Sequence, residues 1–262
     1  MKKLYLILLK TPLILLVVAI IFSSCVPQKK IKYLQQKSDA VAKTEFINAR
    51  KINYTIQPGD NLYIKISSIN EKANSIFNAE SQSRQQYMNN DISVYLNSYT
   101  VDDNGFIDFP LIGKLLIKNL TIKETKNKVQ EKLSEYIKES IVIVKLVNFN
   151  ITMLGEVHRP GEYKIYQDEI NIFEALSLAG DLGDFADRKN IVLVRQTKTG
   201  SNLHRLDLTS NNVLESDYFY LVPNDIIYVE PLKGKQFTFA NFPYAVIFSA
   251  ISTTLLLINF FK

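Results

Sequence analysis

Residues 154–195 read LGEVHRPGEYKIYQDEINIFEALSLAGDLGDFADRKNIVLVR, and the order of signals in this run decides the fold. A β-rich strand over residues 151–157 ends in a His-Arg-Pro-Gly turn. Pro160 fixes φ there, and Gly161 is expected to adopt the positive φ that a type II turn requires. A return strand is expected over residues 162–166.

A short helix is predicted after the return strand. Asn171 is its expected N-cap, and Glu174 three residues later completes a capping box. Gly180 and Gly183 end the helix, and a strand over residues 191–195 closes the unit. The order strand, turn, strand, helix, loop, strand is that of a β-grasp module. One face of the helix is apolar and is formed by Ile172, Phe173, Leu176 and Ala179.

The same run resembles the soluble-ligand-binding β-grasp domain of outer-membrane polysaccharide export proteins. The resemblance rests on the ordered phrases G-E-V-x-x-P-G-x-Y, L-A-G-x-L and A-D-x-x-N-I-V-L-V-R, and Asp181 departs from it where the family often has a second glycine. We interpret the matching residues first as scaffold, because turn glycines and cap residues build the fold. They are Gly155, Glu156, Val157, Pro160, Gly161, Tyr163, Leu178, Ala179, Gly180, Ala186, Asp187, Asn190 and Arg195.

The N-terminus has the features of a secretory signal over residues 1–24. Three lysines and no acidic residue precede an apolar run over residues 13–22, and Ser-Ser-Cys follows. This resembles a lipoprotein cleavage site in which Cys25 becomes the lipidated first residue, which would give stable membrane anchoring. The alternative is an uncleaved N-terminal anchor. Cys25 is the single cysteine, so an internal disulfide is excluded.

The net charge of +5 is mostly a property of the signal. Lys2, Lys3 and Lys10 supply three of these charges, which leaves +2 for residues 25–262. Because no clustered basic face remains, the sequence argues against nucleic-acid binding.

A second module is predicted over residues 52–147, after a polar tether at residues 25–51. Pro58, Gly59 and Asp60 form a turn, and alternating apolar and polar residues from Leu62 onward predict a strand. Peptidoglycan-binding LysM domains open with a similar phrase but then enter a helix. Residues 71–97 are rich in Asn, Gln and Ser and are expected to form an exposed insertion, partly helical.

The rest of this module resembles the polysaccharide export domain of the same family. Residues 103–105 are expected to form a hairpin turn, Thr121 and Glu124 a capping box, and residues 141–147 a buried strand. The helix face is expected to contain Ile122, Val129, Leu133 and Tyr136. The residues that match the family are Pro58, Gly59, Asp60, Leu62, Asp102, Gly105, Pro110, Gly113 and Leu120.

The predicted fold class is α+β, with a small mixed-sheet export domain, a β-grasp domain over residues 148–231 and one C-terminal membrane helix. Leu221-Val222-Pro223-Asn224-Asp225 leads into the final strand of the β-grasp domain, and residues 232–241 form a linker. Residues 242–261 carry no charge and are long enough to span a bilayer. A stripe of Ala245, Ser249, Ser252 and Asn259 is expected to pack against other copies or to line a lumen; the alternative is a plain anchor.

No enzyme site, cofactor or metal site is predicted. His158 and His204 are the only histidines, and neither has a recognisable partner in the sequence. The resemblance implies an oligomeric outer-membrane lipoprotein that exports capsular or extracellular polysaccharide. Its implied partners are an acidic or neutral polysaccharide, an inner-membrane copolymerase or tyrosine kinase, membrane lipid and further copies in a ring. The alternative is a cell-wall or glycan-binding lipoprotein that conducts nothing.

Overall fold

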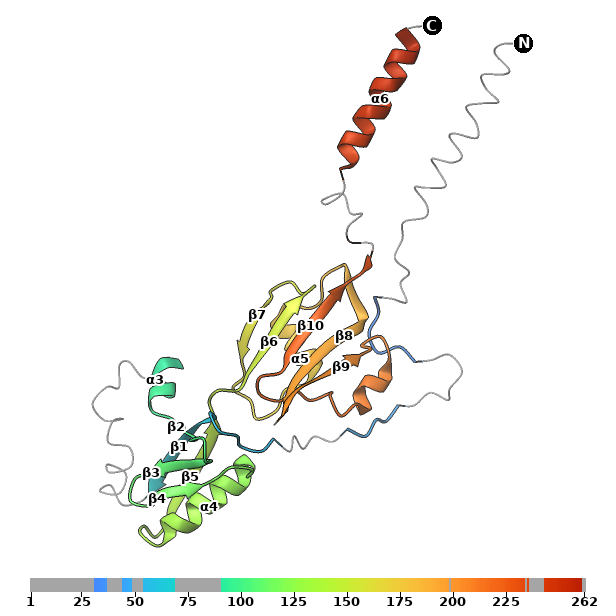
Figure 1. Ribbon diagram of the computed structural model, residues 1–262. Helices are drawn as coiled ribbons and strands as arrows, with labels where there is room; N and C mark the ends of the chain where they lie inside the picture. Colours follow the sequence, from blue (N-terminus) through green and yellow to red (C-terminus); the bar gives the residue numbers. More distant parts are fainter. Residues whose placement is uncertain are drawn as a thin grey trace.

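The computed structural model describes residues 31–36, 44–48, 54–68, 91–197, 199–233, 235 and 243–260. Within them the chain builds two α+β domains, each with its own hydrophobic core, and a C-terminal helix (Figure 1). The signal, Cys25 and residues 71–90 of the expected insertion lie outside the described residues.

The first domain is built on a three-stranded antiparallel sheet with the order β2-β1-β5. Leu62, Ile64 and Ile66 of β1 are buried, while the residues between them are more exposed, as the alternation predicted. Helix α4 packs against β5, and β3 and β4 form a separate hairpin. The elements are β1 (Asn61–Ser68), α3 (Asp91–Leu96), β2 (Tyr99–Thr100), β3 (Phe106–Phe109), β4 (Gly113–Leu116), α4 (Ile122–Ser134) and β5 (Ser140–Leu146).

The predicted turn at residues 103–105 forms, and across it the Asp102 N–H donates to the Phe106 carbonyl at 2.8 Å, but the described parts of β2 and β3 do not pair as neighbouring strands. Gly105 donates its N–H to the carbonyl of Asp102 at 2.8 Å and has a φ of 90°. The strand before this turn, β2, pairs with β1 instead, and β3 pairs with β4. The hairpin reversal therefore occurs at residues 110–113, where Leu111 and Gly113 have positive φ.

Helix α4 begins with the predicted capping box. The Glu124 N–H donates to the Thr121 hydroxyl at 3.2 Å, and the Thr121 N–H donates to the Glu124 carboxylate at 2.7 Å. Val129 and Leu133 are buried as expected, but Tyr136 lies beyond the helix and is 56% exposed. Thr125, one turn before Val129, completes the buried face.

The second domain is a five-stranded mixed sheet with the order β7-β6-β10-β8-β9. Strand β10 lies parallel to β6 and antiparallel to β8. The last strand of this domain is therefore the middle strand of the sheet. Helix α5 buries Ile172, Ala175 and Leu176 in the core. The elements are β6 (Asn150–Gly155), β7 (Gly161–Lys164), α5 (Ile172–Leu178), β8 (Ala186–Thr197), β9 (Gly200–Leu206), the 3₁₀ helix η2 (Asn211–Glu215) and β10 (Ile226–Pro231).

The expected positive φ at Gly161 is wrong. Gly161 begins β7 and pairs with Met153, and it is absent from the positive-φ glycines among the described residues. Sheet pairing requires an extended backbone, and this requirement overrides the local turn preference after Pro160. The position in this strand pair that requires glycine is Gly155. Its φ is 84°, and an added Cβ would lie 2.1 Å from the Val229 carbonyl oxygen.

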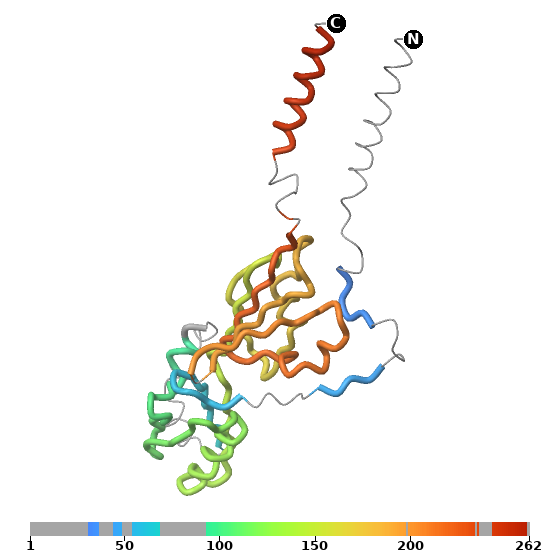
Figure 2. Tube along the Cα trace, turned by 45° about the vertical axis from the view of Figure 1, so that its right-hand side comes forward, coloured from blue at the N-terminus to red at the C-terminus, as the bar shows by residue number. Residues whose placement is uncertain are grey.

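Part of the predicted tether lies against the second domain (Figure 2). The Leu34 N–H donates to the carbonyl of Leu208 at 3.0 Å, and the Gln35 N–H donates to that of Thr209 at 2.6 Å. Residues 31–36 are thus held along the segment that follows β9.

Tyr33 fixes this segment through its side chain. Its hydroxyl donates to Asp181 at 2.6 Å, its ring contacts Phe173 edge-on, and the Arg188 guanidinium lies 5.5 Å from the ring centroid. Burial, together with the bond to Asp181, raises the pKa of the Tyr33 phenol. Asp181 itself has a φ of 73°, which explains why a glycine would suit this position.

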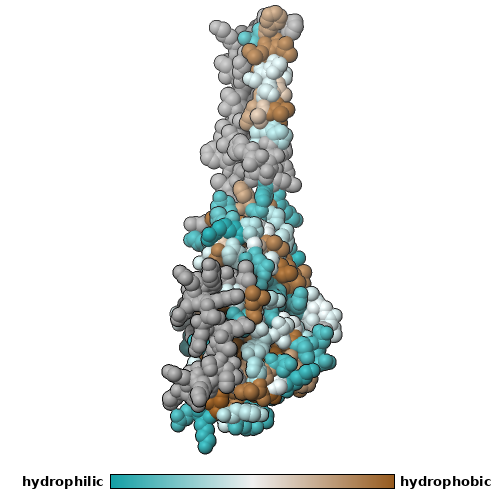
Figure 3. All heavy atoms as spheres, turned by 90° about the vertical axis from the view of Figure 1, so that its left-hand side faces the viewer, coloured by the Kyte–Doolittle hydropathy of each residue, from teal (hydrophilic) through white to brown (hydrophobic). Residues whose placement is uncertain are grey.

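The C-terminal helix α6 runs over Tyr244–Phe260, and none of its residues is buried. Figure 3 shows it at the top of the molecule as mostly hydrophobic or near-neutral residues, above domains that expose many hydrophilic ones. No helix in the described part of the chain combines the length and apolar character needed to cross a membrane. The expected membrane helix at residues 242–261 is therefore not supported.

Candidate functional site

A groove of about 910 Å³ opens between the two domains. The first domain contributes the loop from Tyr54 to Asp60, and the second domain contributes the end of β8 and the two loop segments at residues 215–217 and 220–224. Most of the lining residues are polar or aromatic, and they come from segments that are distant in the sequence.

Two turns with the same design contribute residues to the lining of the groove. In Gln57-Pro58-Gly59-Asp60, the aspartate N–H donates to the Gln57 carbonyl at 3.2 Å, and Gly59 has a φ of 87°. Proline at the second position and a positive φ at the third are the requirements of a type II turn. The Asp60 carboxylate also accepts the Gln57 N–H at 2.8 Å, which locks the turn.

The second turn, Val222-Pro223-Asn224-Asp225, repeats these contacts. The Asp225 N–H donates to the Val222 carbonyl at 3.2 Å, and its carboxylate accepts the Val222 N–H at 2.8 Å. Asn224 takes the place of the glycine, with a φ of 66°. Each turn leads directly into a strand, β1 in the first domain and β10 in the second.

The Asp60 carboxylate is buried among neutral donors. The Tyr54 hydroxyl lies 2.8 and 2.9 Å from its two oxygens, and the Asn148 amide donates to it at 3.4 Å. Asp60 is only 3% exposed, and burial raises the pKa of its carboxyl, with the donors acting in the opposite direction. Burial also raises the pKa of the Tyr54 phenol, which the neighbouring Asp60 charge raises further.

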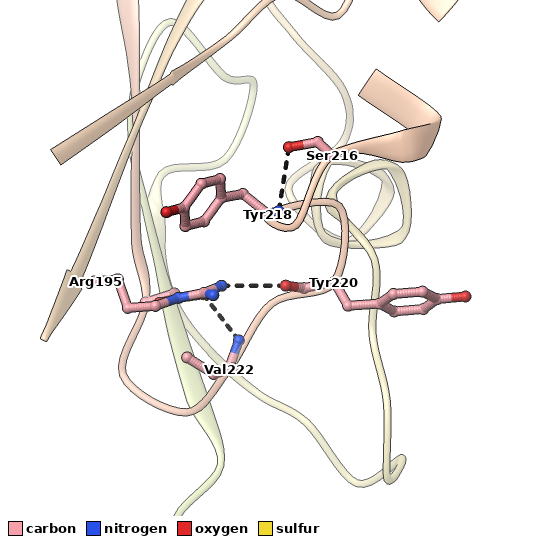
Figure 4. A network of polar contacts seen from close by, with 6 residues as sticks. Arg195, Ser216, Tyr218, Tyr220 and Val222 are labelled. Atoms are coloured by element: carbon pink, nitrogen blue, oxygen red, sulfur yellow. Dashed lines mark hydrogen bonds and ion pairs between the residues drawn. The ribbon is translucent and has the colours of Figure 1, made fainter. Parts of the chain in front are cut away.

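The Asp225 carboxylate instead has a cation as its partner. Arg195 binds it through Nε at 3.0 Å and Nη2 at 2.7 Å, while the same Nη2 donates to the Tyr220 carbonyl at 3.1 Å. The side chain of Asp225 is fully buried and that of Arg195 is 19% exposed. Burial raises the pKa of the Asp225 carboxyl, and Arg195 opposes that shift. Figure 4 shows Arg195 directed at the Tyr220 carbonyl, while the Tyr220 ring points away.

Both histidines have partners that the sequence did not predict. The Arg195 guanidinium lies 5.3 Å from the Tyr218 ring centroid, and the His204 ring stacks on the same tyrosine at 3.6 Å. His158 places Nδ1 3.2 Å from the Asp181 carbonyl oxygen. These are packing contacts. Among the described residues, no three His, Cys, Asp or Glu side chains are grouped as a metal site would need.

The connector between the domains binds both turns. The Asn148 side chain contacts Asp60 and also accepts the Asn61 N–H at 3.1 Å, just after the first turn. The Asn150 carbonyl accepts the Asn224 N–H, in the second turn, at 2.8 Å. Asn148 in the connector and Asn150 at the start of β6 therefore set the two turns relative to each other and define the groove.

Of the predicted motif residues, Pro58, Gly59, Asp60 and Arg195 line the groove. The others are scaffold: Gly180 ends α5 with a φ of 77°, and Pro160 precedes β7. The groove was not predicted from the sequence. The available signal was a three-residue motif, Pro-Gly-Asp at residues 58–60 and Pro-Asn-Asp at residues 223–225, which precedes a β-rich run in each domain. The site residues predicted at the C-terminus, Ala245, Ser249, Ser252 and Asn259, all lie on the exposed helix α6.

Comparison with known protein families identifies both domains. Residues 48–147 match the family described as polysaccharide biosynthesis/export protein, and residues 150–229 match the SLBB domain. The two matches follow each other in the order that the sequence resemblance implied, and together they cover more than half of the 262 residues. The chain therefore belongs to the polysaccharide export family.

Proposed function

We propose that this protein is an oligomeric outer-membrane lipoprotein that forms the periplasmic body and channel for capsular or extracellular polysaccharide export. The observation that carries the proposal is the export domain followed by an SLBB domain, with a connector that binds a turn of each. Such a body holds a fixed path between its domains along which a polymer can pass. The polymer would be acidic or neutral, and an inner-membrane copolymerase or tyrosine kinase would deliver it.

Lipidation of Cys25 would place the SLBB domain close to the membrane. Residues 31–36 lie against that domain, and Tyr33 is bound by Asp181. The chain from Cys25 to residue 31 reaches at most about 20 Å when fully extended. An acylated Cys25 would therefore act as a short anchor, even though residues 25–51 as a whole were predicted to be a tether.

The exposed helix α6 is proposed to contact other copies of the chain in the ring. Its stripe of Ala245, Ser249, Ser252 and Asn259 includes small side chains that permit close helix packing. The Ser249 hydroxyl donates to the Val246 carbonyl of its own helix at 2.9 Å, so it satisfies its hydrogen bond without a partner helix. Alternatively, the stripe would face the lumen of the ring.

The competing function is a glycan-binding or LysM-like lipoprotein that conducts nothing. The likeness of the opening phrase to LysM domains does not extend to the structure, because the turn at residues 58–60 leads into strand β1 and not into a helix. Export-family domains also point to a transport or binding role rather than to catalysis.

Deletion of the gene with plasmid complementation tests the proposal. We expect loss of surface polysaccharide in the deletion strain, restoration by the wild type, and failure with Cys25→Ser. Ser24→Ala is the matched control, because it keeps a small residue before the cysteine and should export normally. Labelled palmitate should enter the wild type and the control only. Normal polysaccharide export by the deletion strain would contradict the export function, and monomers in electron micrographs of detergent-extracted protein would contradict the ring.

A further inference from the structure

We propose that Tyr33 and Asp181 form a latch that holds the N-terminal arm, residues 31–36, on the second domain, and that this latch sets how far the domain can lie from its anchored N-terminus. The inference rests on the proposed lipidation of Cys25. It adds to that proposal the residues that turn a long tether into a short anchor.

The Tyr33 side chain lies in a socket built by three parts of the second domain. Phe173 of α5 contacts the Tyr33 ring edge-on, with the two centroids 5.8 Å apart. Arg188 of β8 is only 8% exposed, and its guanidinium lies 5.5 Å from the same ring centroid, within the range of a cation–π contact. Asp181, in the loop after α5, accepts the tyrosine hydroxyl at 2.6 Å. The socket therefore contacts both the ring and the hydroxyl of a tyrosine.

The backbone of the arm pairs with the segment that follows β9. Leu34 and Gln35 donate their N–H groups to two carbonyls of that segment at 3.0 and 2.6 Å, and the Asn211 N–H donates to the Gln35 carbonyl at 3.2 Å. Main-chain bonds of this kind form with almost any side chains. The residue that determines which part of the arm docks is therefore Tyr33, whose side chain fits the socket.

Asp181 is the position at which this sequence departs from the glycine that is common in the family. Its φ of 73° is one that glycine adopts without cost and other residues adopt with strain. Strain that persists at a position suggests that the side chain has a compensating role. The Asp181 side chain is exposed and is not part of the hydrophobic core, so its bond to Tyr33 supplies that role.

The latch changes the length of the anchor by a large factor. With Tyr33 docked, the chain from Cys25 to Tyr33 reaches at most about 28 Å when fully extended. With the arm released, the predicted tether over residues 25–51 extends to about 90 Å. A latched arm therefore holds the second domain next to the membrane that carries the lipid, whereas a released arm does not fix its position.

Hydrogen exchange of the Leu34 and Gln35 amides in the full-length protein in detergent tests the latch. Tyr33→Phe removes the hydroxyl, and Asp181→Gly removes its acceptor and relieves the positive φ. Each change should speed exchange of these amides about tenfold, because a hydrogen bond to a charged group is lost. The double variant should exchange no faster than either single variant, since both remove the same bond. Wild-type exchange in the single variants, or additive effects in the double variant, would overturn the latch.

Two further measurements separate the latch from a general role in folding. Asp181→Gly should leave the melting temperature unchanged or higher, and a clear decrease would show that the carboxylate serves the fold instead. Tyr136→Phe is the matched control, because it removes an exposed tyrosine hydroxyl from the first domain and should leave the exchange of the arm unaltered. Faster exchange of the arm in this control would contradict the assignment to Tyr33.

A pair of insertions tests the effect of the latch on the anchor. A flexible Gly-Ser insertion of about twelve residues adds roughly 20 Å of reach. After Pro27 it lies before the latch and should move the second domain away from the membrane; after Ala40 it lies beyond the latch and should leave the domain in place. The measurement is energy transfer from a dye on Glu162→Cys, on the edge strand β7, to an acceptor lipid in vesicles of phosphatidylethanolamine and phosphatidylglycerol.

Energy transfer should fall about twofold for the insertion after Pro27 and stay at the wild-type level for the insertion after Ala40. Equal transfer in the two insertions would contradict the latched anchor. The exchange experiment does not depend on lipidation, so its failure is distinct from a failure of the proposed function. If exchange of the arm is unaffected by Tyr33→Phe and Asp181→Gly while Cys25→Ser abolishes export, the latch fails and the export function stands.

Discussion

The turns at residues 57–60 and 222–225 have the same backbone design but place their buried aspartates among different partners. Asp60 is surrounded by neutral donors from Tyr54, Gln57 and Asn148, whereas Asp225 binds the guanidinium of Arg195. The carboxylate locks its own turn in both cases, so the lock does not depend on a cation. The difference shows that Arg195, the one cation among the described lining residues of the groove, is used to hold the second turn.

Removal of Arg195 should break the second turn most severely. Arg195→Met leaves the Asp225 carboxylate fully buried and unpaired, and loss of one partner from a buried pair costs about 3 kcal/mol or more. Urea denaturation followed by circular dichroism measures the change. Arg205→Met is the matched control on the same sheet, because its bond to Glu230 at 2.8 Å is largely exposed and should contribute less than about 1 kcal/mol. Equal losses in the two variants would contradict the special role of Arg195.

Asparagine at the two aspartates should sharpen the comparison. In both turns the asparagine oxygen can still accept the backbone N–H that locks the turn. Asp60→Asn should cost less than about 1 kcal/mol, because the Tyr54 hydroxyl can rotate to accept from the new amide. Asp225→Asn should cost about 2 kcal/mol, because Arg195 loses its charged acceptor. Urea unfolding midpoints of the two variants provide the measurement, and the reverse order would refute this account.

Substitutions at the third position of each turn should change stability less, and in opposite directions in the two turns. Gly59→Ala should cost about 1 kcal/mol through the positive φ alone, since no atom lies within 4 Å of the added Cβ. Asn224→Gly should be neutral or should stabilise by less than about 1 kcal/mol, because glycine adopts the same φ without strain. Thermal unfolding of both variants measures this, and a tolerated Gly59→Ala would remove the turn assignment.

The smallest expected effect is in the pH dependence of stability. Burial raises the pKa of Asp60 in the folded protein, so the folded state holds this proton more tightly than the unfolded state. Its contribution to stability is therefore largest below the ordinary aspartate pKa of about 3.9 and is lost as the pH rises through the raised value. Asp60→Asn should therefore reduce the slope of the unfolding free energy plotted against pH, from about pH 4 upward. An unchanged slope would show that Asp60 does not titrate in this range.

Short-range signals in the sequence predicted the local structure well. The capping boxes at Thr121 and Asn171 both form, because each joins residues three positions apart and needs no tertiary partner. The alternation in β1 likewise predicted its buried face. The predicted positive φ at Gly161 was wrong because pairing with β6 holds its backbone extended. The predicted place of Tyr136 on the apolar helix face was wrong because α4 ends before it.

The sequence by itself determined the two capping boxes, the buried face of β1, the turn at residues 58–60 and the family resemblance. These depend on side-chain periodicity and on backbone preferences within a few residues. Only the tertiary structure decided that the two turns face one groove. Arg195 meets Asp225 from 30 positions away, and Asn148 meets Asp60 from 88 positions away. Such contacts depend on how the sheets pack and on which residues the connector binds. Periodicity along the chain carries no information about either.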